Sequence, residues 1–148
     1  KKVIEDKINT IYSFYVKVLK KEPTIAVLGL NPHNNELNTS SEENRIIIPV
    51  LKKLKKRKIR LIGPYPADTI FNNFEKYKFN VILGMYHDQV LAPFKALFGF
   101  NAINITIGLN YLRVSPDHGT AKDMIGKNKA EFQSLTNSIS FIYQNDIT

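Results

Sequence analysis

Cysteine is absent from this sequence of 148 residues, which excludes a disulfide framework and a metal site built from thiolates. Long apolar runs are also absent, since no stretch approaches the roughly 18 residues that a membrane-spanning helix needs. No signal-peptide pattern opens the chain. We therefore expect a cytoplasmic protein with no membrane partner. The length and the 43% hydrophobic content suffice for one ordinary domain core, or for part of a larger protein.

Glycine-rich nucleotide motifs are missing as well. The chain has neither G-x-G-x-x-G nor G-x-x-x-x-G-K-[ST], so nucleotide binding would need another geometry. The net charge of +8 is concentrated in residues 52–60, and such a run can indicate a nucleic-acid partner. However, no aromatic residues interleave it, and Leu51 and Leu54 have the spacing of a buried helix edge. We favour a solvated helix face and expect no nucleic-acid partner.

Apolar residues recur with helical spacing in some segments and form short β-branched runs in others. Helices are expected at residues 3–19, 40–56, 70–77, 90–98 and 131–143. Strands are expected at residues 24–30, 59–62, 80–85 and 102–107. This alternation predicts an α/β protein, layered α/β/α with a largely parallel sheet. In the second helix, Ser40 and Glu43 have the spacing of a capping box, and Pro49 should kink or break the helix.

The three histidines are all expected in loops that follow strands. His87 belongs to a polar cluster, residues 86–89, at the end of an apolar strand, which is where open α/β sheets build active sites. His33 and His118 follow other strands. One loop histidine is usually a surface residue, whereas three beside Asn, Asp or Gln favour a functional site. Neutral imidazole is the commonest metal ligand, and a carboxylate such as that of Asp88 can orient it.

Basic residues nearly vanish between residues 79 and 121, where only Lys95 and Arg113 remain. Both could bind a phosphate or carboxylate of a substrate, which arginine can hold through two bonds. The alternative is that they form salt bridges with Asp88 and Asp117, the acidic residues of the same stretch. The sequence leaves both interpretations open. Residues 117–127 place an acid, a base and several small residues at an expected helix start. Helix N-termini attract anions, so this segment could also bind one.

Four motifs carry a resemblance to a known family. They are G-L-N-P-H at 29–33, G-P-x-P-A-D-T at 63–69, M-Y-H-D-Q at 85–89 and S-P-D-H-G-T-A at 115–121. In this order and spacing they resemble the 4-hydroxythreonine-4-phosphate dehydrogenases of pyridoxal phosphate biosynthesis. The run at 118–127 is similar to a segment of isocitrate and isopropylmalate dehydrogenases, which bind their nicotinamide nucleotide without a Rossmann motif. The resemblance implies an isocitrate/isopropylmalate dehydrogenase-like fold.

The resemblance also implies roles for individual residues. The implied metal ligands are His33 and His87, with a third ligand upstream of this chain. The implied acidic residues near the metal, assigned to catalysis, are Asp68 and Asp88. The implied substrate-binding residues are Lys95, Asn104 and Arg113. The implied nucleotide-binding residues are His118, Gly119, Thr120, Ala121 and Lys127. The implied cofactors are NAD or NADP and one divalent metal ion (Zn, Mg or Co), and the implied assembly is a homodimer whose active site draws on both subunits.

The implied reaction is a metal-assisted oxidation of 4-phosphohydroxy-L-threonine. Hydride passes to NAD(P)+, and loss of CO2 then gives 3-amino-2-oxopropyl phosphate. We expect residues 1–148 to be the C-terminal portion of a two-domain dehydrogenase, because the chain begins inside an expected helix, and to be inactive alone. Two alternatives remain: a paralogous dehydrogenase of a phosphorylated threonate or erythronate, and an inactive dimerisation fragment. Departures from the family pattern at residues 34–39 and at Val90 bear on loop conformation and substrate preference more than on the chemistry.

Overall fold

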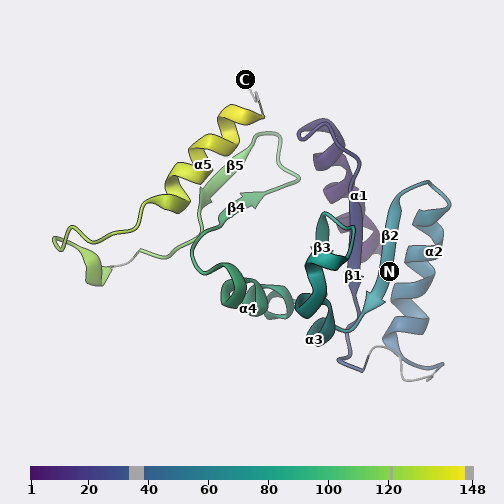
Figure 1. Cartoon of the computed structure of the whole chain (residues 1–148). Coiled ribbons are helices and arrows are strands. Elements are labelled where there is room, and N and C mark those ends of the chain that lie inside the picture. Colours follow the sequence, from purple (N-terminus) through teal and green to yellow (C-terminus); the bar gives the residue numbers. More distant parts are fainter. Residues whose placement is uncertain (34–38, 121, 146–148) are drawn as a thin grey trace. The chain divides into compact units, whose positions relative to one another are not determined.

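The computed structural model describes residues 1–33, 39–120 and 122–145 (Figure 1). The chain divides into two compact units, Lys1–Pro93 and Phe94–Thr148, which are described separately below. Within the described residues, no helix is both long enough and apolar enough to cross a membrane.

The first unit is built on a parallel sheet of strands β1 (Thr24–Leu28), β2 (Arg60–Tyr65) and β3 (Val81–Leu83), in the order β2-β1-β3. The central strand β1 pairs with both neighbours, and its residues from Ile25 to Leu28 are fully buried. Burial on both faces explains why this segment reads as a continuous apolar run. The predicted α/β class and the parallel pairing are confirmed.

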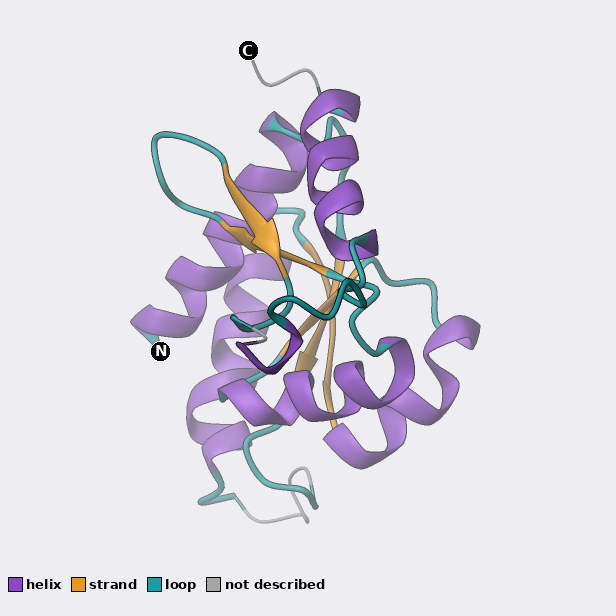
Figure 2. Cartoon of the chain, turned by 90° about the vertical axis from the view of Figure 1, so that its left-hand side faces the viewer, coloured by secondary structure: helices purple, strands orange, loops and turns teal. Residues whose placement is uncertain are grey.

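Helices cover both faces of this sheet (Figure 2). Because side chains alternate along a strand, Ile25 and Val27 face one layer while Ala26 and Leu28 face the other. The first layer consists of α1 (Lys2–Lys17) and α2 (Ile48–Lys55). The second layer consists of α3 (Ala67–Ile70), the 3-10 helix η2 (Phe71–Lys76) and the beginning of α4 (His87–Phe98). The result is the expected α/β/α layering.

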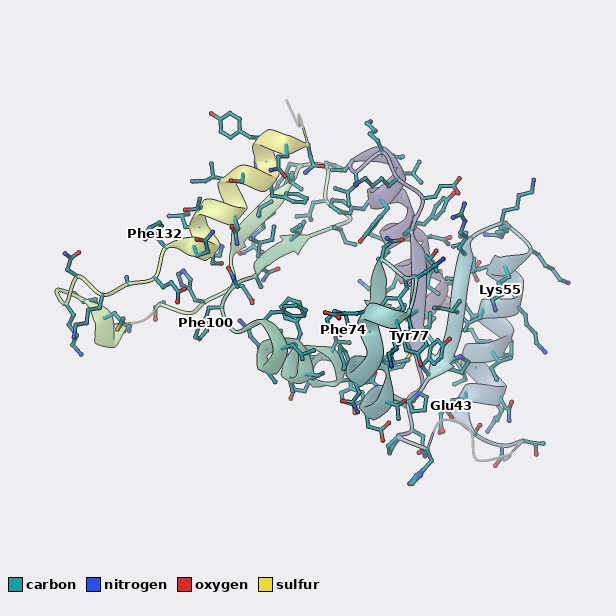
Figure 3. All side chains as sticks on the ribbon, in the orientation of Figure 1. Glu43, Lys55, Phe74, Tyr77, Phe100 and Phe132 are labelled. Carbon is teal, nitrogen blue, oxygen red and sulfur yellow. The ribbon has the colours of Figure 1, made fainter. Side chains whose placement is uncertain are left out.

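The basic run at residues 52–60 forms the solvent-facing side of α2 and the turn after it. Leu51 and Leu54 are buried in the core, whereas Lys55 is exposed and projects from α2 (Figure 3). Lys53 Nζ also lies 2.8 Å from Glu5 Oε2 of α1. The exposure of these lysines agrees with a solvated helix face, and the expected absence of a nucleic-acid partner stays a prediction.

The second helix differs from the expected one at its start. A π-helical turn, η1 (Glu43–Ile47), precedes α2, and Pro49 falls in the first turn of α2. The helical backbone continues from Glu42 to Lys55, so Pro49 marks the change from π-helical to α-helical turns and not the predicted break. The capping box of Ser40 and Glu43 stays a prediction. Ser41 Oγ accepts from the Asn44 amide at 3.3 Å, and the buried Glu43 carboxylate accepts from the Leu30 amide.

Helix α4 starts earlier than expected, at His87 instead of Val90. The predicted loop position of His87 is therefore wrong. The physical reason lies in Gln89, whose Oε1 accepts a hydrogen bond from the Met85 amide at 2.7 Å and so satisfies a backbone donor at the helix entry. Val90 packs against the core cluster on the second face of the sheet.

The second unit contains an antiparallel hairpin, β4 (Ile103–Thr106) and β5 (Arg113–Pro116), on which α5 (Gln133–Gln144) packs. A short 3-10 helix, η3 (Lys122–Met124), lies between β5 and α5. Strand β5 was not predicted, because its sequence, R-V-S-P, has no apolar run and forms a strand through its pairing with β4. The expected fourth strand thus exists but pairs antiparallel.

Candidate active site

Three of the motif loops in the first unit meet at one edge of the parallel sheet. Parallel strands end at the same edge, so the segments after β1, β2 and β3 bring His33, Asp68 and His87 to that edge. Because β1 is the central strand and pairs directly with β3, the loop of His33 neighbours the loop of His87, as expected. Asp68 lies in the exposed first turn of α3.

His87 is the first residue of α4 and is held by its neighbour in the chain. Its Nδ1 lies 2.7 Å from Asp88 Oδ1, and the two side chains are 78% and 84% exposed. The expected contact between the histidine and the carboxylate is thus present. A carboxylate bound to Nδ1 fixes the ring and leaves Nε2 available, which is the usual arrangement of a metal-ligating histidine.

His33 closes a short turn after β1. Its backbone amide donates to Asn31 Oδ1 at 2.9 Å, a side-chain turn typical of asparagine. The residues that follow, 34–38, lie outside the described residues, as does most of the unusual loop noted in the sequence. Within the described chain, no group of three or more His, Cys, Asp or Glu side chains could hold a metal ion. His33 and His87 could supply two ligands of a site and not a complete one.

Glu43 is a residue of this edge that the sequence did not reveal. Its side chain is buried, and Oε1 accepts hydrogen bonds from the amides of Leu30 and Asn31 at 2.8 Å each. Figure 3 shows it at the end of the sheet toward which β1 and β2 run. Burial opposes ionisation, but the backbone donors outweigh it and hold the pKa of Glu43 below its ordinary value. Oε2 has no hydrogen-bond partner among the described residues.

Gln89 is the second residue missed. It is only 7% exposed, and its amide bonds to both the segment after β1 and the segment before α4. The sequence offered one signal, a glutamine near a helix start, but the residue stood in a polar cluster expected to lie in a loop. Neither residue could be recognised from the sequence, because burial at these positions depends on which strands become neighbours.

Lys95, in the second unit, pairs with Asp117. Its Nζ donates to Asp117 Oδ2 at 2.5 Å and to the Asp117 carbonyl oxygen at 2.6 Å. The ammonium also lies 4.9 Å from the centroid of the Phe100 ring, within range of a cation–π interaction. The salt-bridge alternative therefore holds for Lys95 in this structure, and its substrate-binding role stays a prediction.

Arg113 and Asn104 lie on one face of the hairpin. Arg113 pairs in register with Thr106, two residues from Asn104 and so on the same side of β4. Arg113 Nη1 donates to Thr106 Oγ1 at 2.9 Å, so this arginine does not form the alternative salt bridge within the described residues. Arg113 begins β5 and Asp117 follows its end, roughly 13 Å further along at 3.3 Å per residue. Asp117, the partner of Lys95, thus lies beyond the opposite end of β5 from Arg113.

A pocket of about 470 Å³ lies in the second unit, beside the S-P-D-H-G-T-A motif. His118 and Gly119 line it together with the apolar side chains of Phe100 and Met124. His118 Nδ1 lies 3.0 Å from the Gly119 carbonyl oxygen, so its ring is held at the pocket wall. A cavity that joins apolar surface to a few polar groups is typical of a small-molecule site.

The other expected nucleotide-binding residues lie apart from the described lining of this pocket. Thr120 and Lys127 are exposed, and neither is among its described lining residues. Ala121 lies outside the described residues.

Comparison with known proteins agrees with the motifs. The sequence model of one family, described as "Pyridoxal phosphate biosynthetic protein PdxA", matches residues 1–142. The chain belongs to the PdxA family. The chain is 42% identical over 143 residues to the 4-hydroxythreonine-4-phosphate dehydrogenase of Aquifex aeolicus (strain VF5), an alignment that covers 96% of this chain and 44% of that protein.

Solved structures of two dehydrogenases share the fold. The crystal structure of 4-hydroxythreonine-4-phosphate dehydrogenase from Klebsiella pneumoniae superposes with a TM-score of 0.79 at 35% identity, covering 98% of this chain and 44% of that one. A terephthalate 1,2-cis-dihydrodioldehydrogenase from Burkholderia xenovorans LB400 superposes with a TM-score of 0.69 at 27% identity, covering 94% and 44%. The chain thus spans less than half the length of these relatives.

Proposed function

We propose that the whole protein containing this chain oxidises 4-phosphohydroxy-L-threonine with NAD(P)+ and that decarboxylation then yields 3-amino-2-oxopropyl phosphate, in pyridoxal phosphate biosynthesis. The observation that carries this proposal is the convergence of His33, Asp68 and His87 at one sheet edge in a chain of the PdxA family. Because the chain spans less than half of its relatives, the activity is proposed for the whole protein, with this chain as its C-terminal portion.

In the proposed site, His33 and His87 hold a divalent metal ion (Zn, Mg or Co) together with a ligand from outside this chain. The fit rests on the exposed His87 ring, whose Nδ1 bonds to Asp88 while Nε2 remains available. When bound, such an ion polarises substrate oxygens and lowers the pKa of a hydroxyl group. Asp88 orients His87, and Asp68 supplies an exposed carboxylate at the same edge for proton transfer.

The second unit supplies the groups proposed to bind the charged parts of the substrate. Arg113 has the fork geometry that recognises phosphate or carboxylate, and Asn104 on the same hairpin face can donate or accept hydrogen bonds. Lys95 would exchange its bond to Asp117 for a substrate anion. The nicotinamide nucleotide, which accepts the hydride, is proposed to use the pocket of His118 and Gly119. Thr120, Ala121 and Lys127 are proposed to bind the nucleotide as well. We propose a homodimer as the functional assembly.

A second candidate function is the oxidation of a related substrate, such as a phosphorylated threonate or erythronate. It is favoured by the likeness to a terephthalate dihydrodiol dehydrogenase, a protein of this fold that is named for a different substrate. Comparing NAD(P)H formation from 4-phosphohydroxy-L-threonine and from phosphorylated threonate by the whole protein separates the two candidates. Preferential turnover of the threonate would contradict the first.

The metal assignment is tested with histidine variants of the whole protein, because one ligand is expected to lie outside this chain. His87→Ala and His33→Ala should each reduce bound metal, measured by titration with Co2+ and its visible absorption. His118→Ala is the matched control, because His118 is expected at the nucleotide and belongs to the other unit. Wild-type Co2+ binding by His87→Ala would refute the metal site.

A further inference from the structure

Buried polar side chains are few in the first unit, and they converge on one loop. Within its described residues, the buried polar or charged side chains are Glu43 and Gln89. Glu43 bonds to the amides of Leu30 and Asn31, and Gln89 bonds to the carbonyl oxygen of Gly29. Burial of polar groups costs free energy unless they are hydrogen-bonded. These two buried side chains make their hydrogen bonds to the backbone of the loop that leads to His33, and they fix its position.

Gln89 does more than hold this loop, because its side chain bonds in two directions. Nε2 donates to the Gly29 carbonyl oxygen at 2.7 Å, while Oε1 accepts from the Met85 amide at 2.7 Å. Gly29 directly follows β1, and Met85 lies shortly after β3. One buried side chain therefore joins the carboxyl ends of two neighbouring strands whose connected residues are far apart in the sequence.

The two bonded backbone groups are the bases of the histidine loops. Gly29 opens the G-L-N-P-H segment that ends at His33, and Met85 opens the segment that reaches His87 two residues later. The Gly29 amide also donates to the Tyr65 carbonyl oxygen at 2.9 Å, which fixes the same point to the end of β2. A shift at Gln89 would therefore change the spacing between the two histidine loops.

We propose that Gln89 is the positioning residue that sets the separation of His33 and His87. This inference rests on the proposed function, which assigns both histidines to one metal ion. A neutral primary amide suits the role, because it offers one donor and one acceptor on a single rigid group. Neither a carboxylate nor an apolar side chain of the same length can make both bonds.

A purely structural role would also lower stability when Gln89 is changed, so the test must separate positioning from stability. Gln89→Met keeps the length and removes both bonds. The matched control is Asn80→Ala, since Asn80 Oδ1 accepts from the Thr24 amide at 2.9 Å and so links β1 and β3 at their opposite, amino ends. Both variants cut a link between the same two strands, but only one link is at the histidine edge.

Two measurements are made on the whole wild-type protein and on both variants of it. Amide hydrogen exchange reports on the loops without metal, and Gln89→Met should accelerate exchange at Met85, whose amide bonds to Gln89 Oε1, at least tenfold. Co2+ titration reports on the histidines, and Gln89→Met should weaken binding about 10–100-fold, as loss of a group that orients metal ligands does. Asn80→Ala should leave both readouts within about twofold of wild type.

The outcomes distinguish this inference from the proposed function. Unchanged exchange at Met85 in Gln89→Met would overturn the inference, and so would unchanged Co2+ affinity despite faster exchange. If wild type and His87→Ala respond alike to Co2+, the metal assignment fails, while the exchange data still decide whether Gln89 joins the loops. Should Gln89→Met fail to fold, Gln89→Asn is measured in the same way, because it keeps the amide but shortens its reach.

Discussion

Replacing Glu43 by alanine should destabilise the first unit and release the loop after β1. The carboxylate accepts amide hydrogen bonds from Leu30 and Asn31 at 2.8 Å each, and hydrogen bonds to charged groups contribute about 1.5–3 kcal/mol each. We take the lower value, because Leu30 and Asn31 are exposed and water can reach their amides after the change. The expected loss in the free energy of unfolding is therefore about 3 kcal/mol for the two bonds.

Glu43→Gln is the matched variant that isolates the charge. Its amide oxygen can still accept both bonds, but these are weaker to a neutral acceptor, and the desolvation of a carboxylate is no longer needed. We expect a loss of about 1 kcal/mol. Urea unfolding, followed through the amide resonances of β1, measures both variants, and an unfolding midpoint of Glu43→Ala equal to that of wild type would refute the reasoning.

The same pair of proteins tests the ionisation of Glu43. Its pKa in the folded state lies below the ordinary value of 4.5, because backbone hydrogen bonds outweigh burial. A depressed pKa contributes stability that is fully present above the unfolded-state value and is lost as the pH falls through the folded-state value. The stability difference between wild type and Glu43→Gln should thus be constant above about pH 5.5 and shrink below pH 4.5. A difference that grows toward low pH would contradict this sign.

Two further substitutions test local features of the units. Gly63→Ala should cost about 2 kcal/mol or more, measured by urea unfolding, because Gly63 has φ +108° and an added Cβ would meet the Val27 carbonyl oxygen. Asp117→Asn should lower the stability of the second unit by about 1 kcal/mol through loss of the partly buried pair with Lys95. A double-mutant cycle with Lys95→Met checks the second estimate, and strictly additive effects would show that the pair contributes nothing.

The elements that the sequence predicted are those whose local pattern and tertiary environment agree. The run from Thr24 onward is apolar and β-branched, and it becomes the strand buried on both faces. Strand β5 was not predicted, because Arg113 and Ser115 give its sequence no apolar stripe. It forms a strand only through its pairing with β4. The start of α4 was missed for a similar reason, since the bond that closes its entry comes from the side chain of Gln89.

The candidate site was predictable to the extent that it follows from topology. Parallel strands end at one edge, so polar motifs after β1, β2 and β3 had to gather there, and His33, Asp68 and His87 do. The hydrogen-bond and salt-bridge partners of individual side chains were not predictable. Whether Lys95 stands free or binds Asp117 depends on the approach of two segments that only the folded unit defines.

The buried polar side chains of the first unit lie at the carboxyl ends of its strands, and this position bears on where the functional site lies. Asn80 links β1 and β3 at their amino ends while exposed to water, so a strand link needs no buried amide. At the carboxyl ends, Gln89 and Glu43 make their links from buried positions, at a desolvation cost that sheet packing does not require. Such a cost is understandable where loop geometry must be fixed closely, as it must around metal ligands. The placement of these two residues therefore favours the edge of His33 and His87 as the functional part of this unit.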